Sequence, residues 1–341
     1  MPRRTEIATA LAAQDDLYTA LRRLAAMLPD LTLAEVRAAA PAREAHRLAG
    51  VDQGLLQAVL RAGAGLAPIP TAVAVRDWLA RTTPAPLFLP DIAASSCLAL
   101  LTRGEHPDMP AFSDPAFDPW FARHQAAGIR YGLGAYGENR SVYATAQFAD
   151  RASPERRTMH TGIDVFAPAG TPVFAPLPGR ILHLTYNADP LDYGHTLILH
   201  HDLNGQSFYT LYGHLAASLP RLHTGDTVTA GQHIADLGDW PENGGWAPHL
   251  HFQIMSDMLQ QTNGNFFGVG HESLWDIWQQ ICPDPNLILR LPAWQQDASY
   301  AGELADWLPI EPELLKLEKE TLGLYVSEHP LHAVREQQPA P

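Results

Sequence analysis

The sequence predicts an α+β fold, with a mainly antiparallel β-sheet core between a helical N-terminal region and a helical C-terminal extension. Three observations predict it. Leucines 17, 21, 24 and 28 recur at three- and four-residue intervals, as on one face of a helix. After about residue 130, glycines and prolines separate short runs of β-type residues. From 311 to 325 the leucines again follow a helical period.

The N-terminal region, residues 1–105, is expected to form four or five short helices. Thr32 and Glu35 have the spacing of a capping box, and Asp52 and Thr71 are further candidate helix starts. Residues 106–129 contain several prolines, two of them in Asp-Pro pairs, and are therefore expected to form a linker.

The β-rich region is expected to span residues 130–256. Its candidate strands are the runs 172–175, 180–185, 196–201 and 207–215. Residues 257–341 are assigned to the helical C-terminal extension. A chain of 341 residues is long enough for more than one domain.

Composition excludes several functional classes. The formal net charge of −14 would repel a polyanion, so nucleic acid is not an expected partner. No run approaches the roughly 18 apolar residues of a membrane-spanning helix, and no membrane partner is expected. The two cysteines, Cys97 and Cys282, are far apart and indicate neither a disulfide framework nor a thiolate metal site.

The first residues do not have the pattern of a secretory signal. Glu6, Asp15 and Asp16 stand where such a signal needs an apolar run. A cytoplasmic location is the expectation, and the alternative is the cell envelope reached by an unrecognised export route.

The first motif with chemical content is His160-Thr161-Gly162-Ile163-Asp164. In an extended backbone, residues 160, 162 and 164 point to the same side. One imidazole and one carboxylate can then converge on one ion, with Gly162 leaving open space between them. This ligand pair suits zinc.

A second motif, His249-Leu250-His251-Phe252, alternates so that both histidines share one strand face and the apolar residues share the other. A catalytic zinc takes three protein ligands and keeps one position open for water. His160, Asp164 and one of these two histidines would complete the set, and the other would be free to act as a general base.

A third motif, Tyr209-Thr210-Leu211-Tyr212-Gly213-His214, reads as a strand that ends in a histidine. Taken alone, His214 is more simply a structural residue than a catalytic one.

Together these motifs resemble those of the lysostaphin-type (LytM-type) zinc metallopeptidases. That family carries H-x-G-x-D-x-x-A-x-x-G-T-P-V, then Y-x-H-L, then H-L-H-F. The stretch from His160 to Val173 matches the first motif at every signature position, and Tyr212 to Leu215 and His249 to Phe252 match the others. The resemblance covers about residues 130–256.

The resemblance implies a zinc endopeptidase in which His160, Asp164 and His251 bind the metal. It implies that His249 and His214 act on the attacking water and the developing oxyanion. The implied substrates are peptidoglycan-type or Gly-rich peptides, including muropeptides. One departure lies between Gly238 and His249, where a longer loop with Trp240 and Trp246 replaces the family's short turn.

Two further expectations follow from the resemblance. The chain is similar to a subgroup whose peptidase segment is fused to a phosphotransferase and a class III aminotransferase, which suggests such enzymes as partners. The alternative function is a catalytically silent zinc-binding domain for peptide recognition or regulation, although every residue of the implied site is present.

Overall fold

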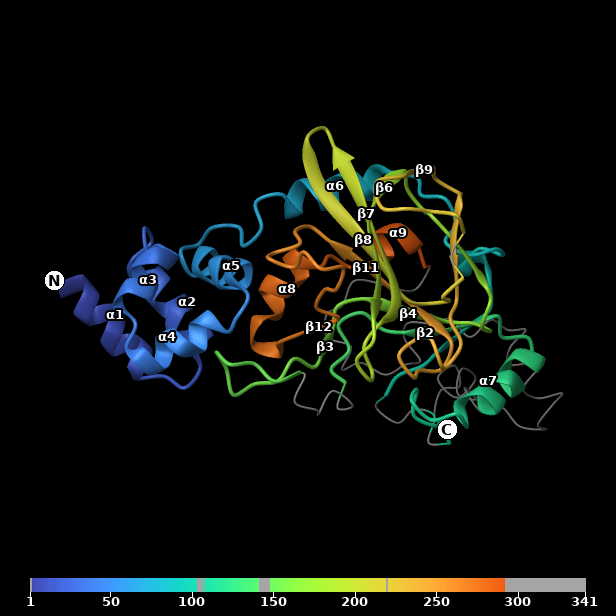
Figure 1. The fold of residues 1–341 in the computed structure, drawn as a ribbon, viewed down its shortest axis with the longest axis horizontal. Coiled ribbons are helices and arrows are strands. Elements are labelled where there is room, and N and C mark those ends of the chain that lie inside the picture. Colours follow the sequence, from blue (N-terminus) through green and yellow to red (C-terminus); the bar gives the residue numbers. More distant parts are fainter. Residues whose placement is uncertain (1, 103–105, 107, 141–147, 219, 292–341) are drawn as a thin grey trace, which may run out of the picture.

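The computed structural model of the chain describes residues 2–102, 106, 108–140, 148–218 and 220–291. A group of short helices stands at one end of the molecule, and the rest is built around a large twisted sheet with further helices beside it (Figure 1). This arrangement is the α+β fold that the sequence predicts.

Five helices form the N-terminal group: α1 (Pro2–Ala12), α2 (Leu17–Met27), α3 (Leu33–Ala39), α4 (Ala42–Ala49) and α5 (Gln53–Gly63). Leu17, Leu21 and Leu24 are buried, as their spacing predicts. The predicted capping box is present, because Thr32 accepts from the amide of Glu35 and the Glu35 carboxylate accepts from the amide of Thr32. Asp52 caps α5 with its side chain, which accepts from the amides of Gly54 and Leu55.

The rest of the predicted helical region packs against the sheet or pairs with it, and is not part of the N-terminal helical group. It contains α6 (Ala72–Arg81), the 3-10 turn η1 (Ile92–Ala94) and strand β1 (Cys97–Ala99). Thr71 precedes α6, but its side chain makes no cap and instead donates to the carbonyl of Ser256. Strand β1 pairs in parallel with β2 (Tyr131–Gly134), so the sheet begins before residue 105.

Within the described residues, the main sheet has eight strands in the order β1-β2-β4-β11-β8-β7-β6-β9, and every pairing except β1 with β2 is antiparallel. Its other strands are β4 (Ile163–Phe166), β6 (Gly179–Asn187), β7 (Gly194–Leu203), β8 (Gln206–Leu215), β9 (Thr227–Val228) and β11 (His249–Met255). Two smaller pairs join β5 (Pro172–Phe174) with β10 (His233–Asp236), and β3 (Met159–His160) with β12 (Val269–Gly270). All four predicted strand runs are confirmed.

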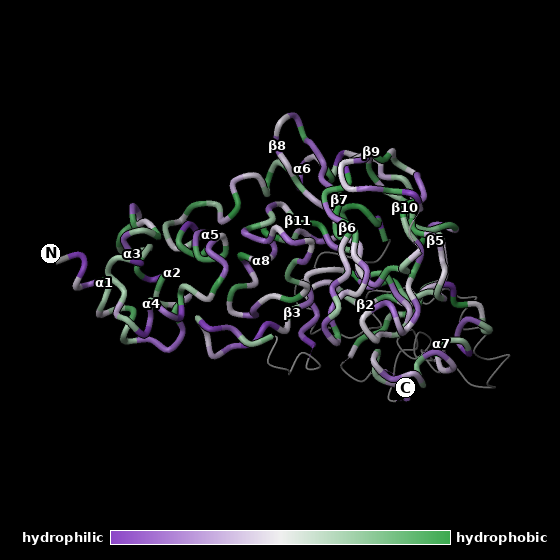
Figure 2. Tube along the Cα trace, viewed as in Figure 1, coloured by the Kyte–Doolittle hydropathy of each residue, from purple (hydrophilic) through white to green (hydrophobic). Residues whose placement is uncertain are grey.

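The two faces of the sheet are buried against different layers. Leu250, Phe252 and Ile254 point into the core shared with α6, whereas Met255 on the opposite face packs in the core shared with the N-terminal helices. That second core includes α8 (Trp275–Ile281), which lies between the helical group and the sheet (Figure 1). In Figure 2, helices α2 and α5 carry hydrophobic and hydrophilic positions side by side, as expected for helices with one buried face.

Residues 106–129, predicted as a linker, contain helix α7 (Phe117–Ala126). Phe117 and Trp120 are buried, and the Phe117 ring lies 5.2 Å from that of Phe166 on β4. The prolines therefore mark turns around a helix that packs on the sheet, and the segment is not a free connection. A local pattern of chain-breaking residues does not report this aromatic packing.

The described part of the C-terminal region, residues 257–291, combines β12 with η3 (Glu272–Leu274), α8 and α9 (Asn286–Leu289). The amphipathic run 311–325 lies outside the described residues. Among the residues described, no helix has the length and apolar character that crossing a membrane would require.

Candidate metal centre

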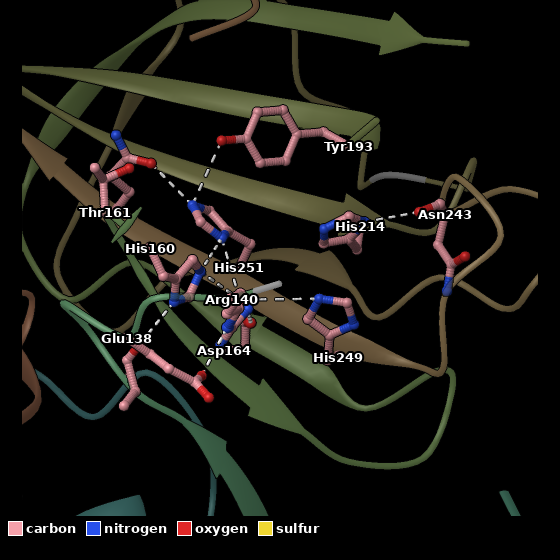
Figure 3. A network of polar contacts seen from close by, with 12 residues as sticks. Glu138, Arg140, His160, Thr161, Asp164, Tyr193, His214, Asn243, His249 and His251 are labelled. Atoms are coloured by element: carbon pink, nitrogen blue, oxygen red, sulfur yellow. Dashed lines mark hydrogen bonds and ion pairs between the residues drawn. The ribbon is translucent and has the colours of Figure 1, made fainter. Parts of the chain in front are cut away.

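Three side-chain atoms converge at the edge of a cleft: Nε2 of His160, Oδ1 of Asp164 and Nδ1 of His251 (Figure 3). The two nitrogens are 3.1 Å apart, and they lie 3.3 Å and 3.1 Å from the carboxylate oxygen. Ligands about 2.0–2.1 Å from a tetrahedral zinc are separated by about 3.3 Å. The three atoms thus occupy positions that three zinc ligands would take, and the residues fit the metal.

Strand register places these ligands together. His251 on β11 is the direct partner of Asp164 on β4, so their side chains leave the sheet on the same face. On its other side His251 pairs with Gly213, one residue before His214. His160 comes from the separate strand β3 and reaches the same point. Sequence reasoning expected this convergence of His160, Asp164 and a histidine from β11, and the structure brings them together.

Only a glycine fits at position 162, between His160 and Asp164. A Cβ atom added there would lie 2.6 Å from Cε1 and Nε2 of His251, so the imidazole occupies the space that a larger residue would fill. The space that the sequence predicts at Gly162 is therefore occupied by the imidazole of His251.

Three of the four site histidines have their Nδ1 atom fixed by a backbone carbonyl. Nδ1 of His160 donates to the carbonyl of Ala135, Nδ1 of His214 to that of Asn243 and Nδ1 of His249 to that of Ala247, each at 2.7 Å. A carbonyl oxygen can only accept, so Nδ1 carries the proton in all three rings. The Nε2 atom of each neutral ring is then left with a free electron pair for the site.

The charges of the site suit a metal. Burial, together with the Arg140 guanidinium, lowers the pKa of His160 to about 4. Burial also lowers the pKa of His249 and holds that of His214 well below its ordinary value. For Asp164, burial acts to raise the pKa, but His160 and Arg140 outweigh it and keep the pKa well below its usual range. Neutral imidazoles and an ionised carboxylate are the forms that bind metal ions.

An ion-pair chain behind Asp164 is a feature that sequence reasoning missed. Nη1 of Arg140 lies 2.7 Å from Oδ2 of Asp164, and Nε of Arg140 lies 2.7 Å from Oε2 of Glu138. All three side chains are buried. Thr102 donates to the other oxygen of Glu138 through its amide and its hydroxyl. The Glu-x-Arg spacing could have suggested a pair, but no sequence signal connects it to Asp164.

His214 lies beside His249, with ring centroids 4.2 Å apart (Figure 3). Its backbone is left-handed, with φ of 62°, which is uncommon for a residue other than glycine. Its amide donates to Tyr193 and its carbonyl accepts from Gly238, so hydrogen bonds on both sides hold this conformation. Strained residues of this kind cluster at functional sites.

The long loop before β11 supports His214 and lines the cleft. The Asn243 side chain accepts from the amide of Trp246 and donates to the carbonyls of Gly238 and Trp246. These bonds fix the loop, and with it the backbone carbonyl of Asn243 that accepts from Nδ1 of His214. Trp246 is buried and reaches the cleft beside His249. The departure that the sequence showed at this loop therefore contributes a wall of the cleft.

The cleft has a volume of about 300 Å³. Asp164, His214, His249 and His251 reach it, and aromatic side chains flank them, among them Phe112, Tyr193, Trp246, Phe266 and Phe267. Concave, largely apolar sites with a few convergent polar groups are typical of ligand-binding pockets. Fold and site together describe a β-sheet domain in which three convergent side chains could hold a metal ion, with two further histidines in the same cleft.

Comparison with known proteins agrees with this description. Residues 158–264 match the model of Peptidase family M23, and that segment contains His160, Asp164, His214, His249 and His251. The M23 (LytM-type) family is therefore supported for this segment, and the N-terminal helices lie outside the match.

Three similar proteins illustrate the match. An uncharacterized metalloprotease of Haemophilus influenzae is 36% identical over 95 residues, which are 28% of this chain and 18% of that protein. DD-carboxypeptidase/endopeptidase Mpg of Neisseria meningitidis is 35% identical over 111 residues, 32% of this chain and 23% of Mpg. The catalytic domain of lysostaphin from Staphylococcus simulans is 30% identical, covering 35% of this chain and 79% of that domain, with a TM-score of 0.26. The chain matches less than a quarter of the length of the two curated relatives.

Proposed function

We propose that the chain is a zinc metalloendopeptidase whose metal is held by His160, Asp164 and His251. The observation that carries the proposal is the near-equilateral set of three ligand atoms, 3.1–3.3 Å apart, beside two more histidines in the same cleft. Three ligands leave a position open, as a catalytic zinc requires.

Zinc bound there would supply a Lewis acid that polarises the scissile carbonyl and lowers the pKa of water towards ~7. The chain's own residues handle the protons. His249 and His214 are both neutral, with the Nε2 electron pair available for the site, so either can take the proton of the attacking water. The other, once protonated, can donate to the oxyanion or to the leaving amine.

The supporting residues keep this arrangement ready. The Arg140 guanidinium holds Oδ2 of Asp164, so that Oδ1 faces the two ligand histidines. Phe166 stacks on the His249 ring at 4.7 Å, and Phe117 of α7 packs on Phe166. Groups already in place need no rearrangement during the reaction.

For the substrate we propose peptidoglycan-type or Gly-rich peptides, including muropeptides. The support is the match of residues 158–264 to an M23 peptidase model and the similarity to a protein named DD-carboxypeptidase/endopeptidase. Phosphotransferase and aminotransferase partners stay a prediction from the sequence resemblance.

The experiment is a zinc titration of the purified protein combined with digestion of defined muropeptides and glycyl peptides, read by mass spectrometry. One tightly bound zinc and cleavage of an internal peptide bond are expected. Asp164→Ala should lose most of the zinc, and His233→Ala, which changes an exposed histidine on β10, should keep it. Zinc binding without cleavage of any peptide would favour the silent binding domain instead.

A further inference from the structure

The side chain of Gln253 contacts the ligand His251 from the side away from the metal position. Its Oε1 lies 2.8 Å from Nε2 of His251, whose other nitrogen faces His160 and Asp164. Gln253 is fully buried and lies two residues after His251 on β11, on the same strand face.

The neighbours of Gln253 determine which end of its amide faces His251. Nε2 of Gln253 lies 3.0 Å from the carbonyl oxygen of Phe267 and 3.1 Å from Sγ of Cys282. A carbonyl oxygen only accepts, so it requires the NH₂ end of the amide. The amide oxygen must then face His251.

The orientation of the amide in turn selects the tautomer of His251. The oxygen of Gln253 accepts a hydrogen bond, so Nε2 of His251 carries the proton. Nδ1 is left with its electron pair directed at the position between His160 and Asp164. A metal-binding histidine is commonly fixed in this manner through its second nitrogen.

We infer that Gln253 is a positioning residue that fixes the tautomer and ring orientation of His251 for metal binding. This inference rests on the metal site of the proposed function and adds a residue to it. The acceptor is neutral, so it orients the imidazole without adding a second negative charge behind the site. Phe267 and Cys282, which come from different segments, hold the amide in place.

The test is the zinc affinity of Gln253→Met, a residue of similar length that has no donor and only a weak acceptor in its thioether sulfur. Loss of a partner behind a metal ligand typically costs about 10–100-fold in metal affinity, so the zinc Kd should rise by about that factor. Competition with a chromogenic chelator measures it. The visible spectrum of the cobalt(II)-substituted protein should also change, because Nε2 of His251 would keep only its longer contact, 3.5 Å, with the Tyr193 hydroxyl.

Two further variants make the result specific. Gln253→Glu keeps an oxygen able to face His251 but loses the donor to the Phe267 carbonyl, so its zinc Kd should lie between those of Gln253→Met and the parent protein. Ile254 lies on the opposite face of β11, in the hydrophobic core. Ile254→Val removes one buried methyl group without touching His251, so it should leave the zinc Kd unchanged. If Gln253→Met does not fold, Gln253→Asn replaces it, because an amide one methylene shorter cannot span the same contacts.

The outcomes separate this inference from the proposed function. If Gln253→Met binds zinc as tightly as the parent protein, with an unchanged cobalt spectrum, the positioning role is wrong while the metal site stands. If the parent protein itself binds no zinc, the proposed function fails. A loss of affinity shared equally by Ile254→Val would also overturn the inference, since it would reflect general packing.

Discussion

Nη1 of Arg140 lies 2.7 Å from Oδ2 of Asp164, the carboxylate oxygen that does not face the two ligand histidines. The pair is buried, and the same guanidinium also binds Glu138. One cation therefore compensates two carboxylates behind the metal centre. A buried charge without its partner is strongly unfavourable, so this arrangement contributes to folding as well as to the site.

Arg140→Met should destabilise the protein by about 3–5 kcal/mol, because it leaves two buried carboxylates uncompensated. Urea unfolding of the metal-free protein measures the change. The control is Arg22→Met, which breaks a partly exposed pair with Asp276 and should cost only about 0–1 kcal/mol. Equal effects of the two variants would contradict the role of Arg140.

His249→Ala should keep the zinc and lose most hydrolysis, whereas His251→Ala should lose both. Nδ1 of His251 lies 3.1 Å from Oδ1 of Asp164, but Nε2 of His249 lies 3.9 Å from it. A zinc that bound both histidines would have no open position. Zinc stoichiometry and peptide cleavage in both variants test this. Release of metal by His249→Ala as readily as by His251→Ala would contradict an open site.

Gly162→Ala should weaken zinc binding although it adds a single methyl group. The new Cβ would lie 2.6 Å from two ring atoms of His251, so the ring must move from its ligand position. The expected rise in zinc Kd is at least tenfold, by analogy with other changes that disturb the orientation of a ligand. Chelator competition measures it, and an unchanged Kd would show that the ring has room to adjust.

Phe117→Ala should destabilise the protein by about 3–5 kcal/mol, as expected for removal of a buried aromatic side chain. Phe117 packs on Phe166, which stacks on the His249 ring, so hydrolysis should fall as well. Thermal unfolding and peptide cleavage provide the measurements. A loss below about 1 kcal/mol would mean that residues 106–129 act as a linker after all.

The metal-free protein should lose stability as the pH falls from about 6.5 to 4. Burial lowers the pKa of His160 and of His201 to about 4. Above about 6.5 these histidines are neutral in both states. Below it the unfolded chain takes up protons that the folded protein does not, so each histidine lowers the free energy of unfolding by about 1.4 kcal/mol per pH unit.

Replacement of one of these histidines isolates its contribution. His201 is buried away from the metal centre, between the carbonyl of Pro178 and the hydroxyl of Thr210. His201→Gln should reduce the slope of stability against pH by about 1.4 kcal/mol per unit. Unfolding free energies at four pH values from 4.5 to 7.5 give the slope, and the same slope in both proteins would refute this assignment.

The sequence alone determined the features that depend on the spacing of residues close together in the chain. Alternation along His249 to Ile254 gave both the histidine face and the apolar face, and the capping pair Thr32 and Glu35 marked a helix start. These features depend on neighbours within a few residues, and their geometry is the same in any context. The same alternation also places Gln253 on the histidine face, so that residue could have been noticed.

Only the tertiary structure decided which distant groups support the site. The contacts of Arg140 with Asp164, of Asn243 with His214 and of Phe117 with Phe166 join residues 24 to 49 positions apart. The left-handed backbone of His214 likewise depends on hydrogen bonds from two other segments. No local period reports such contacts, because they arise from strand register and from packing between elements, which are set only when the whole sheet forms.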